Sequence, residues 1–195
     1  MTGRTRERCA AVDVHYPDGG GAVAALVLAA DATFATVLAG RTARLAAVAP
    51  YRPGAFYLRE LPALRAVLAG VDGLDLLVVD GYVWLDAAGR PGLGAYAHRE
   101  FGVPVIGVAK TAFRGASHAV PVVRGRSARP LYVTAAGVAP AAAADVVRRM
   151  AGRYRIPDAL RLVDALSRGS VQGGAQDVSE QRSAGSPDSG MTSRG

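Results

Sequence analysis

Two short apolar runs on either side of a helical stretch constrain the fold of this chain more than any other feature. Residues 76–79 (Leu-Leu-Val-Val) and 103–109 (Val-Pro-Val-Ile-Gly-Val-Ala) are apolar, and residues 93–101 between them have helical character. Apolar runs of this length are typical of strands buried on both faces, and two such strands joined through a helix pair in parallel. The sequence therefore predicts a parallel β-α-β unit.

The chain before this unit predicts an antiparallel beginning. Residues 9–16 and 22–30 have the pattern of two strands, and residues 17–21 (Pro-Asp-Gly-Gly-Gly) supply the tight turn of a hairpin between them. A third strand is expected within residues 35–49. An antiparallel hairpin beside a parallel unit indicates a mixed sheet.

Helices account for most of the other periodic segments. Leucine and valine recur at helical spacing over residues 61–68, and Pro62 is tolerated only in the first turn of that helix. The remaining expected elements are strands at 119–123 and 130–135 and proline-initiated closing helices at 140–153 and 157–167. The pattern predicts a single α/β domain, a mixed β-sheet flanked by helices with the ribonuclease H-like layout. Other α/β folds fit this periodicity almost as well.

Composition limits the classes of function. The 195 residues suffice for one domain with a substantial core, and 23 basic against 16 acidic residues give a net charge of +7. A basic excess suits a polyanionic partner such as nucleic acid. Cys9 is the one cysteine, so neither an internal disulfide nor a multi-cysteine metal site can form.

The chain divides into three parts by composition. We expect a flexible N-terminus over residues 1–7, a folded domain over residues 8–168 and a disordered low-complexity tail over residues 169–195. The apolar runs are too short to cross a bilayer, and the N-terminus lacks the apolar core of a signal peptide. These features predict a cytoplasmic protein without membrane contact.

Three acidic residues stand where a cation site could form. Asp13 lies inside an otherwise apolar strand, Asp80 ends the apolar run 76–79, and Glu60 lies near the start of a helix. Each also has an ordinary explanation: a hydrogen-bonded aspartate, a turn residue, and a carboxylate favoured by the helix dipole. If the three converge on one face, they repel one another unless cations fill the space. Asp164 on the last helix is a further candidate, with a solvated helix residue as its alternative.

Such a cluster has a definite chemistry. Oxygen ligands favour Mg²⁺ or Mn²⁺ over zinc. Two such ions about 4 Å apart can activate a water and stabilise the leaving oxygen in phosphodiester hydrolysis.

Two further features suit a nucleic-acid substrate. Lys110 ends the strand at 103–109, and because every other basic residue is an arginine or histidine, it is conspicuous as a group that could bind a phosphate or orient a water. Residues 50–54 (Pro-Tyr-Arg-Pro-Gly) form a rigid turn that holds Tyr51 at its tip, where an aromatic could enter a base stack. The alternatives are a surface lysine at a strand end and a tyrosine packed on the core.

These residues belong to a series of motifs in which the chain resembles the endonuclease V family. The motifs are Val-Asp-Val at 12–14, Pro-Tyr-Arg-Pro-Gly at 50–54, Phe-Tyr-Leu-Arg-Glu-Leu-Pro at 56–62, Val-Val-Asp-Gly at 78–81, Gly-Leu-Gly at 92–94, Val-Ile-Gly-Val-Ala-Lys at 105–110, Arg-Tyr-Arg-Ile-Pro-Asp at 153–158 and Arg-Leu-Val-Asp at 161–164. The resemblance covers nearly all of residues 8–168, in order and with compatible spacing.

The resemblance implies a fold and an activity. It implies a ribonuclease H-like catalytic domain and a hydrolase that uses Mg²⁺, with Mn²⁺ as a substitute, to repair DNA that contains deaminated purines. Members of the family cleave the second phosphodiester bond 3′ to deoxyinosine and leave 3′-hydroxyl and 5′-phosphate ends. We expect a monomer without a membrane partner.

By the matching motifs, the resemblance also assigns residues to this chemistry. Asp13, Glu60 and Asp80 would be the metal-binding and catalytic carboxylates, with Asp164 as a weaker fourth ligand, and Lys110 the catalytic lysine. The residues expected at the lesion are Tyr51 as a wedge, its neighbours Pro50 and Pro53, and the pocket glycines Gly81, Gly92 and Gly94.

The chain also departs from the family pattern. Asp86 occupies the place of a histidine that follows the Val-Asp-Gly motif, and the segment after Lys110 is shorter than usual. Asp86 would either add a ligand or repel the DNA. Two alternatives therefore stay open: an endoribonuclease specific for inosine, and a catalytically weakened protein that binds deaminated bases.

Overall fold

A computed structural model describes residues 7–50 and 57–171 of the chain. In chain order the elements are β1 (Cys9–His15), β2 (Ala22–Ala29), β3 (Val37–Leu45), α1 (Tyr57–Leu68), β4 (Leu76–Asp80), α2 (Leu93–Phe101), β5 (Val105–Ala109), β6 (Val120–Val122), β7 (Leu131–Ala136), α3 (Pro140–Arg149) and α4 (Asp158–Ser167). The strands form one mixed sheet in the order β3-β2-β1-β4-β5-β7-β6. The predicted α/β class and mixed sheet are confirmed.

The antiparallel part begins with the predicted hairpin. β1 pairs with β2 from Cys9↔Ala29 to His15↔Val23, and β3 adds to the other edge of β2. The turn needs its glycines, because Gly21 has a φ of 75° and a Cβ there would lie 2.3 Å from the carbonyl oxygen of Leu45.

The parallel part follows from the two apolar runs. β4 pairs in parallel with β1, with Val12 opposite Val79, and β5 pairs in parallel with β4 through the crossover helix α2. The carboxyl ends of β1, β4 and β5 therefore lie at one edge of the sheet, where open α/β sheets bind their ligands. β7 and β6 extend the sheet in antiparallel fashion beyond β5.

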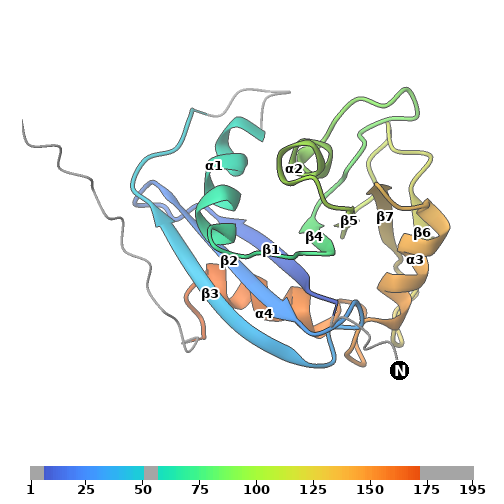
Figure 1. Cartoon of the computed structure of the whole chain (residues 1–195). Helices are drawn as coiled ribbons and strands as arrows, with labels where there is room; N and C mark the ends of the chain where they lie inside the picture. Colours follow the sequence, from blue (N-terminus) through green and yellow to red (C-terminus); the bar gives the residue numbers. More distant parts are fainter. Residues whose placement is uncertain (1–6, 51–56, 172–195) are drawn as a thin grey trace, which may run out of the picture.

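Helices cover both faces of the sheet, as Figure 1 shows. α1 and α2 lie on one face, where Val12 and Val79 pack against Leu64 in one buried cluster. α3 and α4 lie on the other, where Ala11 and Val78 belong to a second cluster. Since side chains alternate along a strand, this division fixes which face each residue of β1 and β4 addresses.

Two expected boundaries are wrong. α1 includes Tyr57, so Pro62 lies inside the helix and not in its first turn; the carbonyl that Pro62 leaves free belongs to the exposed Leu58, where water can bind it. α3 ends at Arg149 and not at residue 153, because Met150 takes an extended backbone (ψ 141°) with its side chain buried.

The proposed flanking segments are only partly described. Residues 1–6 and 172–195, which make up most of the expected flexible N-terminus and tail, lie outside the described residues. None of the helices in the described ranges has the length and apolar character needed to span a membrane.

Candidate active site

Asp13 and Asp80 lie side by side at the carboxyl edge of the sheet. Val12 pairs with Val79, so the two aspartates follow at neighbouring positions of the parallel strands β1 and β4. By strand alternation both side chains start on the face that α4 covers. The sequence placed Asp13 inside one apolar strand and Asp80 at the end of another, and the sheet brings them together.

Glu60 reaches the same place from α1 on the opposite face. Its side chain is only 7% exposed, and it shares with Asp13 and Asp80 a cavity of about 20 Å³, room for about one water molecule. Burial, reinforced by the negative charges of Asp13 and Asp80, raises the pKa of Glu60 to about 8. The three predicted carboxylates therefore face a common space and repel one another.

Lys110 stands at this edge as expected. Its Nζ donates a hydrogen bond of 2.5 Å to Oδ2 of Asp80, and its side chain remains 40% exposed. Burial would lower the pKa of Lys110, but the bond to Asp80 and the charges of Asp164 and Asp13 raise it above its ordinary value. Burial raises the pKa of Asp80 even though Lys110 opposes the shift.

The last helix supplies two groups to the site. Asp164 adds negative charge near Asp80 and Lys110, and its carboxylate accepts a hydrogen bond from Arg168 Nε at 3.3 Å. Ser167, one turn later, is buried and donates a hydrogen bond of 2.6 Å to Oδ2 of Asp13. Sequence analysis missed Ser167, although its spacing of three residues from Asp164 puts both on one helical face.

The side chains present fit a divalent cation. Within residues 7–50 and 57–171, no three acidic, histidine or cysteine side chains already surround a common point closely enough to hold an ion. Glu60 nevertheless lies buried beside the charges of Asp13 and Asp80, a repulsion that a cation between them would relieve. The donors are carboxylate oxygens, which suit Mg²⁺ or Mn²⁺.

The residues expected at the lesion are only partly described. Tyr51 and Pro53 lie outside the described residues, while Pro50, just before them, is exposed. Gly81, directly after β4, has a φ of 120° and open space where a Cβ would stand. Packing requires glycine at the other two positions: a Cβ on Gly92 would lie 2.4 Å from the carbonyl oxygen of Tyr82, and a Cβ on Gly94 would lie 2.6 Å from Val83 Cγ2.

Asp86, the residue in place of the family histidine, stabilises a turn. Its carboxylate accepts a hydrogen bond of 2.9 Å from the backbone N–H of Arg90 and lies 3.4 Å from Arg90 Nε. The guanidinium of Arg90 partly offsets the negative charge of Asp86, which weakens the repulsion between Asp86 and a nucleic acid.

Arg155 is a second residue that sequence analysis did not single out. Its Nη2 donates to the carbonyl oxygens of Lys110 and Pro130, and its Nε donates to that of Arg129 at 3.0 Å. One guanidinium thus joins the end of β5, where Lys110 stands, to the chain entering β7.

The mixed sheet, with acidic residues at its carboxyl edge, defines the ribonuclease H-like class of protein. A sequence model of the family described as Endonuclease V matches residues 2–165. The chain therefore belongs to the endonuclease V family, and its activity is that of a nuclease, a hydrolase. The resemblance found in the sequence motifs is confirmed.

Individual relatives agree with this assignment. An endonuclease V of Azotobacter vinelandii is 35% identical, and the match covers 81% of this chain and 80% of the relative. The crystal structure of an endonuclease V from Streptomyces avermitilis has a TM-score of 0.68 and 31% identity, covering 84% of this chain and 80% of that one. An endonuclease V of Ciona intestinalis, 16% identical, shares the fold with a TM-score of 0.69 over 84% of this chain and 85% of its own.

Proposed function

We propose that this chain is a divalent-metal-dependent DNA repair endonuclease. It cleaves the second phosphodiester bond 3′ to deoxyinosine and leaves 3′-hydroxyl and 5′-phosphate ends. The observation that carries the proposal is the meeting of Asp13, Glu60 and Asp80 around one small cavity, with Lys110 bonded to Asp80.

The carboxylates prepare the site for cations. Asp13, Glu60 and Asp80 would hold Mg²⁺ or Mn²⁺, with Asp164 within electrostatic reach. When bound, such ions supply positive charge that activates a water and stabilises the leaving oxygen. Because the pKa of Glu60 is about 8, this side chain holds a proton at neutral pH, and a bound cation would favour its ionised form.

Lys110 acts on the substrate from the edge of the site. Its ammonium is kept charged by a raised pKa and is partly exposed, so it can bind the phosphate next to the cleaved bond. In the reaction a water oxygen bonds to phosphorus and the bond from phosphorus to the 3′ oxygen breaks. The water proton passes to a base, and the leaving 3′ oxygen takes up a proton.

The choice of substrate rests on charge and on a relative. The net charge of +7 favours a polyanion, and the Ciona intestinalis protein was crystallised with a DNA containing an inosine followed by a ribo-adenosine. Gly81, with open space at the end of β4, lies where backbone could approach the edge of a displaced base.

The proposal is tested by separating binding from cutting. We expect Asp80→Ala to abolish nicking of a deoxyinosine duplex while binding of that duplex stays measurable, since the change removes a ligand for the ion and not the lesion pocket. Equal loss of binding and cutting would contradict the role of Asp80. If a matched strand with ribo-inosine is cut in preference to the strand with deoxyinosine, the protein is an endoribonuclease.

A further inference from the structure

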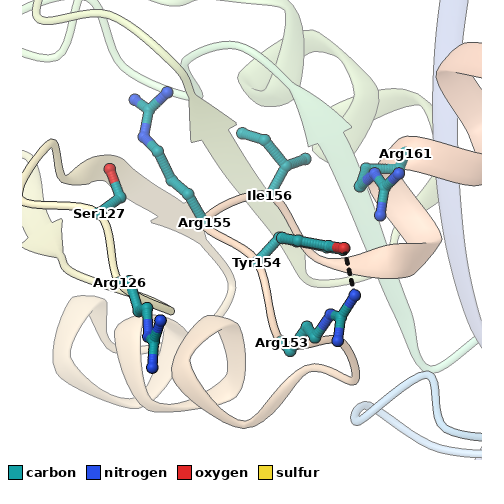
Figure 2. A pocket seen from close by; sticks show the side chains of 7 residues that line it. All are labelled: Arg126, Ser127, Arg153, Tyr154, Arg155, Ile156 and Arg161. Atoms are coloured by element: carbon teal, nitrogen blue, oxygen red, sulfur yellow. Dashed lines mark hydrogen bonds between the residues drawn. The ribbon is translucent and has the colours of Figure 1, made fainter.

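An arginine-rich cleft beside the acidic edge takes no part in the chemistry proposed above. Its volume is about 1020 Å³, and its lining includes Arg126, Arg153, Arg155 and Arg161 but no acidic residue from the described part of the chain. Figure 2 shows that Arg126 comes from one loop, Arg153 and Tyr154 from another, and Arg161 from α4. The cleft therefore gathers positive charge from three separate segments.

The two loops are fixed against each other before any ligand arrives. Arg124, only 7% exposed, donates to the carbonyl oxygen of Gly152 at 3.1 Å and also to that of Met150. Gly125 has a φ of 61°, and a Cβ there would lie 2.6 Å from the carbonyl oxygen of Arg153. A preformed wall of this kind loses little entropy when it binds a partner.

The guanidinium groups of Arg153 and Arg161 are also oriented. Arg153 donates a hydrogen bond of 2.7 Å to the hydroxyl of Tyr154, a contact drawn in Figure 2. The ring of Tyr154 lies 4.9 Å from the guanidinium carbon of Arg153 and 4.8 Å from that of Arg161. Arg161 has Asp158 at 3.6 Å, whereas Arg126 and Arg153 form no ion pair within residues 7–50 and 57–171. Arg153 is therefore held in place without an acidic partner, and Arg126 adds a second such charge to the cleft. Arginines of this kind suit phosphate, which they bind through paired hydrogen bonds.

The cleft adjoins the catalytic edge through Arg155. This residue lines the cleft, and its Nη2 bonds the backbone carbonyl of Lys110. A strand bound at Lys110 would thus continue toward the cleft. We propose that the cleft binds backbone phosphates of the substrate strand away from the lesion, an inference that rests on the proposed nucleic-acid substrate.

Binding of duplexes of different length tests this proposal. Fluorescence anisotropy in chelator would compare a short labelled duplex that ends close to a deoxyinosine with duplexes extended on its 5′ or 3′ side. We expect Arg126→Ala and Arg153→Ala each to weaken binding of one of the two extended duplexes, the one whose added segment reaches the cleft, by about fivefold. For that duplex, the slope of log affinity against log salt concentration should fall by roughly one. Binding of the short duplex should not change. Both side chains are exposed, so the folded state should survive, as circular dichroism would verify.

Arg149→Ala is the matched control. Arg149 lines a separate cavity with Glu7 and Asp31, near the start of β1 and so at the opposite edge of the sheet. We expect this variant to bind every duplex like the unchanged chain. The proposal would be overturned if the Arg126→Ala and Arg153→Ala variants bound the extended duplexes as tightly as the unchanged protein does.

The same measurements keep this inference apart from the proposed function. An adenine duplex of equal length reports phosphate contacts without a lesion. If the unchanged protein neither prefers inosine nor nicks it, yet the two cleft variants still weaken extended duplexes, the proposed function fails and the cleft assignment stands. If nicking of inosine proceeds and the variants bind normally, only the cleft assignment fails.

Discussion

Glu60→Gln should stabilise the cation-free protein in a way that depends on pH. Glu60 is buried beside Asp13 and Asp80, and its pKa lies at about 8, well above the ordinary 4.5. An acid whose pKa is raised by folding stabilises the fold below its unfolded pKa, and that contribution is lost as pH rises through the folded pKa. The free energy of unfolding should therefore fall between about pH 4.5 and pH 8.

The expected size follows from the same values. Each pKa unit corresponds to about 1.4 kcal/mol, so the change from 4.5 to about 8 sets an upper limit of about 5 kcal/mol. Relaxation of the folded protein reduces this, and about 2 kcal/mol is a cautious expectation, or about 4–8 °C in melting temperature for a domain of this size. The pKa of Asp80 is raised as well, so Asp80 also lowers the free energy of unfolding as pH rises. The effect of Glu60 is therefore the difference in stability between the unchanged chain and the Glu60→Gln protein.

Thermal unfolding at pH 5, 6, 7 and 8 in chelator would measure this difference in stability between the two proteins. At pH 5 the Glu60→Gln protein should melt at nearly the same temperature as the unchanged chain. At pH 8 it should melt at a clearly higher temperature than the unchanged chain. Glu100→Gln serves as the control, because Glu100 pairs with Arg65 at the surface and its pKa is lowered. Parallel melting curves for Glu60→Gln and the unchanged chain at all four pH values would refute the reasoning.

Three further substitutions test other parts of the site. Lys110→Ala should reduce the rate of nicking by about 100-fold with substrate affinity nearly kept, because it removes charge at the phosphate; an unchanged single-turnover rate would make Lys110 a mere partner of Asp80. Ser167→Ala should weaken Mn²⁺ binding about tenfold in calorimetry by freeing Asp13, and an unaltered affinity would limit Ser167 to packing. Tyr51→Ala should reduce discrimination of inosine from adenine in competitive nicking, whereas intact discrimination would leave Tyr51 without a role as a wedge.

Local patterns predicted most of the fold. The hairpin of β1 and β2 follows from two apolar runs joined by a short turn. The parallel pairing of β4 with β5 follows from two apolar runs joined through one helix. The end of α3 could not be found this way, because the buried Met150 and its contact with Arg124 depend on distant parts of the chain. The position of Pro62 was missed because helix packing tolerates one lost backbone hydrogen bond.

The site shows the same division. Asp13 and Asp80 were recognisable because acids are rare inside apolar strands, and the sheet register then places them side by side. Ser167 and Arg155 act through partners 154 and 45 residues away. Their local patterns, a spacing of three residues from Asp164 and a place in the motif at 153–158, do not reveal those distant contacts. The arginine-rich cleft likewise exists only once two loops and α4 meet.

The most direct test of the central claim is strand cleavage. A labelled duplex with one deoxyinosine would be incubated with Mg²⁺, with Mn²⁺ or with chelator, beside an identical duplex with adenine. We expect a nick at the second phosphodiester 3′ to the inosine with either metal, and none with chelator or with adenine. Nicking that persists in chelator, equal nicking of the adenine duplex, or no nicking under any condition would contradict the claim.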